Sequence, residues 1–110
     1  MAKLERTLTG DFDARLDYLH DGILGGSASA SWEDGSDYSG PDFRWAVRVY
    51  ERYSLLGGNR VSLSLTLVGD GDRLHLTAIT AGGSQAMFFK LNTVGEESFL
   101  DTLAQVVDSL

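Results

Sequence analysis

The sequence predicts an α+β protein, in which an antiparallel sheet of about five to six strands carries two helices on one face. Three observations support this fold class. Several segments alternate apolar and polar residues, as half-buried strands do. Short glycine-rich turns join the later segments, as in an antiparallel meander. Two further segments carry apolar residues at helical spacing. The predicted element order is β-α-β-β-β-β-β-α, and the length of 110 residues predicts one domain over residues 1–110.

The first two predicted elements are a short strand and a helix. Residues 3–9 have the alternating, threonine-rich composition of a strand. Asp11 is a favourable N-cap, because its carboxylate accepts hydrogen bonds from the free N–H groups of a first helical turn. The glycines at 25 and 26 are expected to end the helix. Its predicted buried stripe consists of Phe12, Leu16, Leu19 and Ile23.

The middle of the chain reads as strands with one buried face each, over residues 27–33, 43–54, 61–68 and 73–80. Residues 33–42, which hold the only proline, are predicted to form a loop. We expect both helices to cover the face that carries Trp32, Trp45, Val47, Leu63, Leu65, Leu74 and Leu76.

The end of the chain combines an apolar segment with a second helix. Residues 86–91 are apolar at both parities, which predicts a strand that is covered twice or that meets a ligand or partner. Glu96 and Glu97 suit the positive end of a helix predicted over residues 96–109. The expected apolar stripe of this helix is Phe99, Leu100, Leu103, Val106, Val107 and Leu110.

Composition argues against several classes of function. The net charge is −7 and the pI about 4.5, so the chain repels nucleic-acid backbones and anionic membrane surfaces. The absence of cysteine excludes thiol nucleophiles, disulfides and cysteine-based metal sites. The first six residues lack the apolar segment of a secretory signal, and no apolar stretch approaches the ~20 residues of a membrane span. From these features we expect a cytoplasmic protein with neither a nucleic-acid nor a membrane partner.

A row of arginines on the strand over 43–54 is the most suggestive candidate site. Arg44, Arg48 and Arg52 lie four residues apart, so they point to one face of the strand together with Tyr50. Arginine binds carboxylates and phosphates through paired hydrogen bonds. The row therefore predicts a site for a small anionic ligand on the polar face of the sheet.

Neighbouring strands are expected to add polar groups to this face. His75 is predicted to share it, together with the hydroxyl groups of Ser62, Ser64, Thr66 and Thr77. In the alternative, the arginines pair with acidic side chains of adjacent strands, such as Glu5 or Glu33, and merely solvate the face.

A second candidate site is apolar. Met87 and Phe89, in the segment without a polar face, are predicted to line a pocket for an apolar ligand or to form a dimer interface. In the alternative, this segment is a buried central strand, since apolar runs usually belong to the core.

Motifs of catalysis and cofactor binding are weak or missing. The segment 82–85 could form an anion-binding turn, but it lacks the Gly-Lys-Ser/Thr ending of a P-loop. There is no Gly-x-Ser-x-Gly sequence, and His20 and His75 are not at zinc-binding spacing. The sequence therefore predicts no catalytic residues, no metal site and no cofactor, and it disfavours a small hydrolase or isomerase.

Three phrases of the sequence carry a resemblance to a known family: residues 46–54, 57–63 and 78–90. They resemble a family of small bacterial proteins that is known only as a domain of unknown function. The element order is also similar to a shortened helix-grip protein, in which a curved sheet wraps a C-terminal helix. The chain has one helix where that fold has two between its first strands, and fold similarity does not fix function.

The sequence thus favours a non-catalytic module that binds a ligand or another protein. A structural homo-oligomer is the alternative, because a sheet covered by helices on one side leaves a face and two edges for a second copy.

Overall fold

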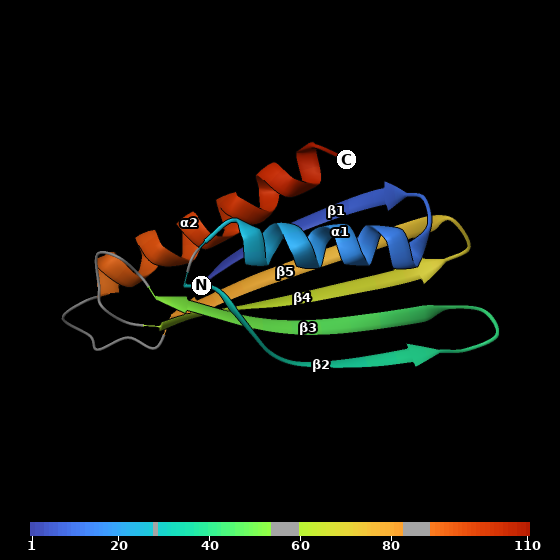
Figure 1. The fold of residues 1–110 in the computed structure, drawn as a ribbon, viewed down its shortest axis with the longest axis horizontal. Helices are drawn as coiled ribbons and strands as arrows, with labels where there is room; N and C mark the ends of the chain where they lie inside the picture. The colour runs from blue at the N-terminus through green and yellow to red at the C-terminus, as the bar shows by residue number, and fades with distance from the viewer. Residues whose placement is uncertain (28, 54–59, 83–88) are drawn as a thin grey trace.

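The structure, a computed structural model, describes residues 1–27, 29–53, 60–82 and 89–110, excluding the side chains of residues 89–95. It contains a five-stranded antiparallel sheet and two helices, which confirms the predicted fold class (Figure 1). In chain order the elements are β1 (Ala2–Thr9), α1 (Phe12–Gly25), β2 (Ser31–Ser39), β3 (Arg44–Tyr53), β4 (Arg60–Asp70), β5 (Arg73–Gly82) and α2 (Phe89–Asp108).

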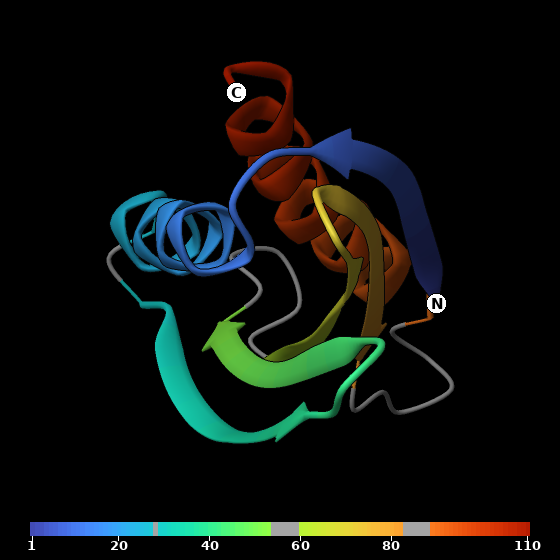
Figure 2. The same cartoon turned by 90° about the vertical axis from the view of Figure 1, so that its right-hand side faces the viewer.

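The strands lie in the order β1-β5-β4-β3-β2, and every neighbouring pair is antiparallel. Strands β3 to β5 therefore form a meander, as expected for these later segments; β2 extends it next to β3, and β1 joins it next to β5. Figure 2 shows both helices on one face of the sheet, which curves around them. The opposite, outer face carries neither helix, and we call it the open face.

Helix α1 forms as the sequence predicts. Asp11 caps it, because its carboxylate accepts a hydrogen bond of 2.9 Å from the backbone N–H of Ala14. Gly10 directly before the cap has a φ of 133°, a value that other residues rarely adopt. The four stripe residues are buried against the sheet, as expected from their spacing: Phe12, Leu16, Leu19 and Ile23.

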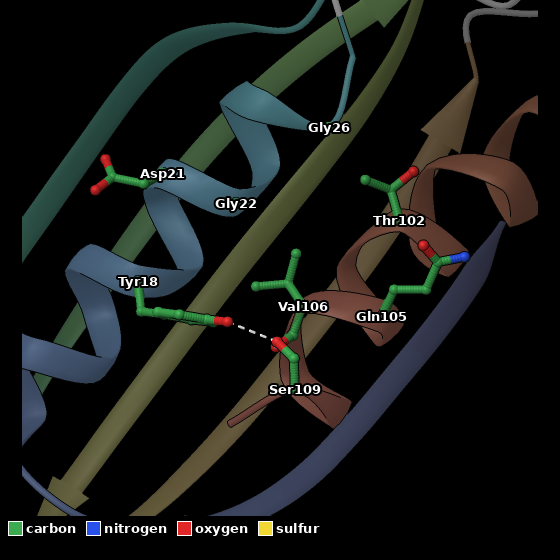
Figure 3. A pocket seen from close by; sticks show the side chains of 8 residues that line it. All are labelled: Tyr18, Asp21, Gly22, Gly26, Thr102, Gln105, Val106 and Ser109. Carbon is green, nitrogen blue, oxygen red and sulfur yellow. Dashed lines mark hydrogen bonds between the residues drawn. The ribbon is translucent and has the colours of Figure 1, made fainter.

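Two glycines of α1 allow α2 to approach closely. A Cβ atom at Gly22 would lie 2.6 Å from a methyl group of Val106, and one at Gly26 would lie 2.5 Å from the methyl group of Thr102. Beside this crossing, Tyr18 and Ser109 share a hydrogen bond of 2.6 Å between their hydroxyl groups (Figure 3). The side chains of Val106 and Thr102 thus lie directly on the backbone of α1. This contact leaves no room for a bulky side chain at Gly22 or Gly26.

The core lies between the two helices and the central strands. The predicted alternation holds on β4 and β5, whose inward residues are fully buried while the residues between them reach the open face. Helix α2 contributes most of its predicted stripe, but Val106 is only partly buried, and Leu110 lies beyond the end of the helix and is 37% exposed. The buried residues of these three elements include Val61, Leu63, Leu65, Leu67, Leu74, Leu76, Ala78, Phe99, Leu100, Leu103 and Val107.

The predicted orientation of β3 is wrong. In the register with β4, Ala46 lies opposite Leu67 and Tyr50 opposite Leu63, so the even-numbered residues of β3 face the helices. Trp45 and Val47, predicted to be inward, lie on the open face. The reason is the amphipathic nature of arginine: its apolar stem packs on the core while its guanidinium reaches acidic groups at the margin. Hydropathy alone therefore misassigned the two faces.

Strand β2 also differs from the prediction. It covers Ser31–Ser39, so most of the segment predicted as a loop over 33–42 is a strand, and the predicted strand over 27–33 begins only at Ser31. Its register with β3 shifts between Trp32 and Asp34, which marks a β-bulge. An edge strand with little burial carries no alternating pattern, because neither of its faces needs to be apolar. Trp32 does lie on the helix side, opposite Tyr50, but remains 54% exposed.

The second half of the apolar segment, residues 89–91, belongs to a helix. Helix α2 begins at Phe89, whereas the sequence predicted its start at 96, so residues 89–91 are helical where a strand was expected. Residues 86–88 lie outside the described residues. An apolar run at both parities does not distinguish a strand from a buried helical turn.

Candidate functional site

The structure separates the residues of the predicted anion site. Arg44, Arg48, Tyr50 and Arg52 do share one face of β3, but this face is turned toward the helices. His75 pairs with Val68 and lies on the opposite, open face. Met87 and the side chain of Phe89, the predicted apolar site, lie outside the described residues.

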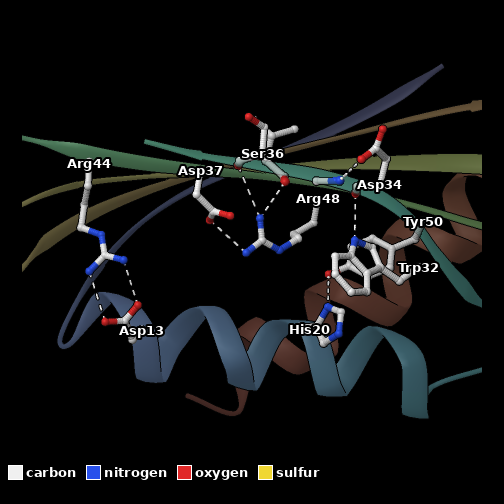
Figure 4. Close-up of polar contacts among 11 residues, drawn as sticks. Asp13, His20, Trp32, Asp34, Ser36, Asp37, Arg44, Arg48 and Tyr50 are labelled. Carbon is white, nitrogen blue, oxygen red and sulfur yellow. Dashed lines mark hydrogen bonds and ion pairs between the residues drawn. The ribbon is translucent and has the colours of Figure 1, made fainter. Parts of the chain in front are cut away.

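Arg44 is held by α1. Its guanidinium donates hydrogen bonds of 3.2 and 2.9 Å to the two carboxylate oxygens of Asp13 (Figure 4). It also stacks on the ring of Phe12, with its central carbon 4.0 Å from the ring centroid. The paired geometry that would bind an anionic ligand is thus already used by Asp13.

Arg48 links β3 to the edge strand β2. Its side chain is only 15% exposed, and it donates a hydrogen bond of 2.9 Å to the carboxylate of Asp37. It also donates to the backbone carbonyl of Val47 at 2.9 Å. Gly35 leaves room for this arrangement, since a Cβ there would lie 3.0 Å from Cδ of Arg48. The contacts of Arg48 therefore stabilise the position of β2, which is otherwise an exposed edge strand.

Arg52 packs on the second helix. Its guanidinium carbon lies 4.5 Å from the ring centroid of Phe99, and it donates a hydrogen bond of 2.9 Å to the hydroxyl of Ser98. Burial lowers the pKa of this guanidinium from its ordinary value. Desolvation of this kind is the cost of placing a cation at the core margin.

Tyr50 is the buried member of an aromatic cluster between β3, β2 and α1. Its hydroxyl lies 2.7 Å from Nδ1 of His20, whose ring meets the ring of Trp32 edge-on with centroids 5.3 Å apart (Figure 4). The indole N–H of Trp32 in turn donates to the backbone carbonyl of Asp34 at 2.8 Å. The sequence placed Tyr50 in the anion site but gave no sign of its contact with His20, which depends on how α1 crosses the sheet.

Burial raises the pKa of Tyr50 strongly; Arg48 nearby lowers it, and Asp21 raises it. In the folded protein the phenol keeps its proton at a pH where the unfolded chain, with an ordinary tyrosine pKa of about 10, releases it. The unfolded state is therefore favoured increasingly as the pH rises above about 10. We expect Tyr50→Phe to remove this contribution, so that its free energy of unfolding falls less between pH 8 and 11 than that of the parent chain. Urea titrations at several pH values in this range measure the free energy of unfolding of both chains. An equal fall with pH in the two chains would contradict the prediction.

The open face carries an apolar surface that the sequence assigned to the core. Tyr38 lies between Phe43 and Trp45, with ring centroids 5.6 and 6.0 Å away. Tyr38 and Phe43 are nearly half exposed, at 45% and 47%. The surface continues through the aliphatic side chains of Val47 and Val49 on β3 and Val68 on β4, whereas Ile79 on β5 is separated from it by Ser64. The alternation over 43–49 was the available signal, but only the register with β4 shows that this stripe faces outward.

A groove of about 510 Å³ runs between the two helices beside their crossing (Figure 3). It is lined by Tyr18, Asp21, Gly22, Gly26, Thr102, Gln105, Val106 and Ser109. Asp21 is the one charged residue of this lining, and no histidine or lysine accompanies it. The groove therefore lacks the paired acid and base that proton transfer needs.

The described part of the chain contains neither a metal-binding group of side chains nor a helix that could span a membrane. Within residues 1–27, 29–53, 60–82 and 89–110, no three histidine, aspartate or glutamate side chains are arranged to hold a metal ion. In the same part of the chain, neither helix combines the length and the apolar character needed to cross a membrane.

Comparison with known proteins gives a family without an assigned activity. A search of curated proteins finds no match to this chain. The similarity to helix-grip proteins, expected from the element order, stays a prediction. The model of DUF6054, described as a family of unknown function, matches residues 1–110, and the chain therefore belongs to this family.

Proposed function

We propose that this chain is a non-catalytic interaction module that binds a protein partner through the open face of its sheet. The observation that carries the proposal is the exposed apolar surface on that face, with Tyr38, Trp45 and Val47 at its centre. Antiparallel sheets with one solvated face usually present polar residues there. Contiguous exposed apolar surface instead marks a site of interaction.

The composition of this surface supports the same proposal. Tyrosine and tryptophan are the residues that most often dominate binding energy at protein interfaces. Here Tyr38 and Trp45 are stacked on each other, with an angle of 19° between their ring planes. Ser64, Thr66 and Thr77 add hydroxyl groups on β4 and β5 without introducing charge.

Ligand binding by the arginine row receives less support. Arg44 and Arg48 are engaged by Asp13 and Asp37, so an anion would have to displace a carboxylate from each. Exposed pairs of this kind are weak, but the partly buried Arg48 also serves two backbone carbonyls. The alternative in which the arginines pair with acidic side chains therefore describes Arg44 and Arg48 better, with Asp13 and Asp37 in place of Glu5 and Glu33, whereas Arg52 donates to Ser98.

Crosslinking from defined positions in the native host cells tests the proposal. A photoreactive phenylalanine analogue at Thr66, which lies opposite Val47 on the open face, is expected to give a discrete crosslinked product. The same analogue at Asp101, an exposed residue of α2, is the matched control and is expected to give none. Mass spectrometry identifies the partner. The proposal fails if the folded Thr66 variant gives no product, or the same products as the Asp101 variant.

A further inference from the structure

We infer that the occupant of the open face is a second copy of this chain, packed sheet against sheet in a two-fold dimer. This inference rests on the interaction module proposed above and names its partner. It depends on the charge of the open face, on the protection of the sheet edges and on the area that the face offers.

The open face carries only a small part of the negative charge of this acidic protein. Register places seven charged residues on it, the basic Lys3, Arg60 and Arg73 and the acidic Glu5, Asp34, Glu51 and Asp70. Glu33, in the bulge of β2, adds an eighth, because its carboxylate contacts Ser31 and Arg60 on the same face. This face therefore carries a charge of −2 out of the −7 of the whole chain, and the remainder lies elsewhere. Two copies repel each other through their other surfaces and meet least repulsion here.

The two edge strands of the sheet carry features that disfavour pairing with a strand of a second copy. The edge strand β2 carries Glu33, Asp34 and Asp37, and its register shift between Trp32 and Asp34 bends it away from a regular ladder. The other edge strand, β1, carries charges at Lys3, Glu5 and Arg6. Charges and bulges on edge strands are the usual means of preventing strand addition. Self-association through an extended sheet is therefore disfavoured, and the face is the remaining route.

The arrangement and size of the face suit a copy of itself. Its apolar residues gather on β3 beside the hydroxyl groups of the middle strand β4, whereas Arg60, Asp70 and Arg73 lie at strand ends, as in interfaces with a polar rim. Five strands about 4.8 Å apart and about ten residues long, at ~3.3 Å per residue, give a face of roughly 800 Å². Stable complexes of standard size bury about 800 Å² on each partner, and the outward curve of the sheet leaves less than the whole face in contact, so the dimer is expected to be a weak one that forms at high concentration. With the two-fold axis at Val47, in the middle of the apolar stripe of β3, this residue of each copy lies near the other.

Light scattering of the purified chain across the micromolar to millimolar range tests the inference. We expect a particle of twice the 11.9 kDa chain mass at high concentration, dissociating on dilution. Val47→Lys is expected to raise the dissociation constant roughly 100-fold, because two lysines would meet in a desolvated interface. Gln105→Lys introduces the same charge on the exposed side of α2 and is expected to leave the constant unchanged.

Tryptophan fluorescence provides an independent measurement. Trp32→Phe leaves Trp45 as the only tryptophan, and its emission is expected to shift to longer wavelength on dilution. The shift is expected to be absent in Trp32→Phe with Val47→Lys. Thr66→Lys replaces Val47→Lys as the charged variant if melting curves show that the latter does not fold.

Three outcomes overturn the inference: a monomer at every concentration, a dimer unaffected by the folded charged variant, or equal effects of Val47→Lys and Gln105→Lys. A monomer in solution together with a Thr66 crosslink to a different protein in cells would reject the second copy and leave the interaction module standing. Absence of both would reject the two proposals together.

Discussion

Replacing Phe99 with alanine is expected to lower the free energy of unfolding by about 3–5 kcal/mol, the range found for large aromatic residues removed from a core. The side chain is fully buried where α2 packs on the sheet. Its loss leaves a cavity and also removes the ring on which the Arg52 guanidinium lies at 4.5 Å. Urea denaturation followed by circular dichroism measures the change.

The matched control for this substitution is Phe43→Ala. Phe43 has the same side chain but is 47% exposed, so in dilute solution its replacement is expected to change stability by less than about 0.5 kcal/mol. Similar losses for the two variants would mean that α2 does not pack on the sheet through Phe99.

The second large effect is expected at the crossing of the helices. Gly22→Leu is expected to lower the free energy of unfolding by about 1–3 kcal/mol, as overpacking does in well-packed proteins. The new side chain would enter the space of Val106, whose methyl group is already 2.6 Å from an ideal Cβ at this position. Because valine is branched at Cβ, Val106 has little freedom to move aside.

Gly25→Leu separates this clash from the effect of helix propensity. An ideal Cβ at Gly25 has no neighbour within 4 Å, so the substitution is expected to be neutral or to stabilise the helix by up to about 0.8 kcal/mol. Adding Val106→Ala to Gly22→Leu is expected to recover part of the lost stability. Equal melting temperatures for the two leucine variants, or no recovery with Val106→Ala, would contradict the close approach of the helices.

The fold could be predicted from the sequence for those elements that have one buried face and one face exposed to solvent. On β4, β5 and α1 the buried residues follow directly from the periodicity, because hydroxyl or charged residues separate the leucines. Strand β3 offers two stripes of mixed character, with Trp45 and Val47 on one and Ala46 and Tyr50 on the other. The choice between them is made by the register with β4, which is a long-range property that no local pattern contains.

The candidate site was predictable to a similar extent. Spacing alone places Arg44, Arg48 and Arg52 on one face, and the structure agrees. Whether His75 joins them depends on the pairing of three strands, and the structure puts it on the other face. The partner Asp37 comes from the neighbouring strand β2 and depends on its register with β3, whereas Asp13 comes from α1 and depends on how this helix packs on the sheet. The exposed aromatic surface was visible as a stripe, but its outward direction was not.

The position of β1 has a consequence for how the chain folds. Ala2 pairs with Thr80, so β1 finds its partner only after β5 has been synthesised. The meander β2 to β5 forms from neighbouring segments and closes short loops, whereas β1 closes a loop that spans most of the chain. We therefore expect docking of β1 onto β5 to follow assembly of the meander. Until then Leu4 stays exposed to solvent, and the nascent chain passes through an incomplete sheet whose β5 edge is unpaired.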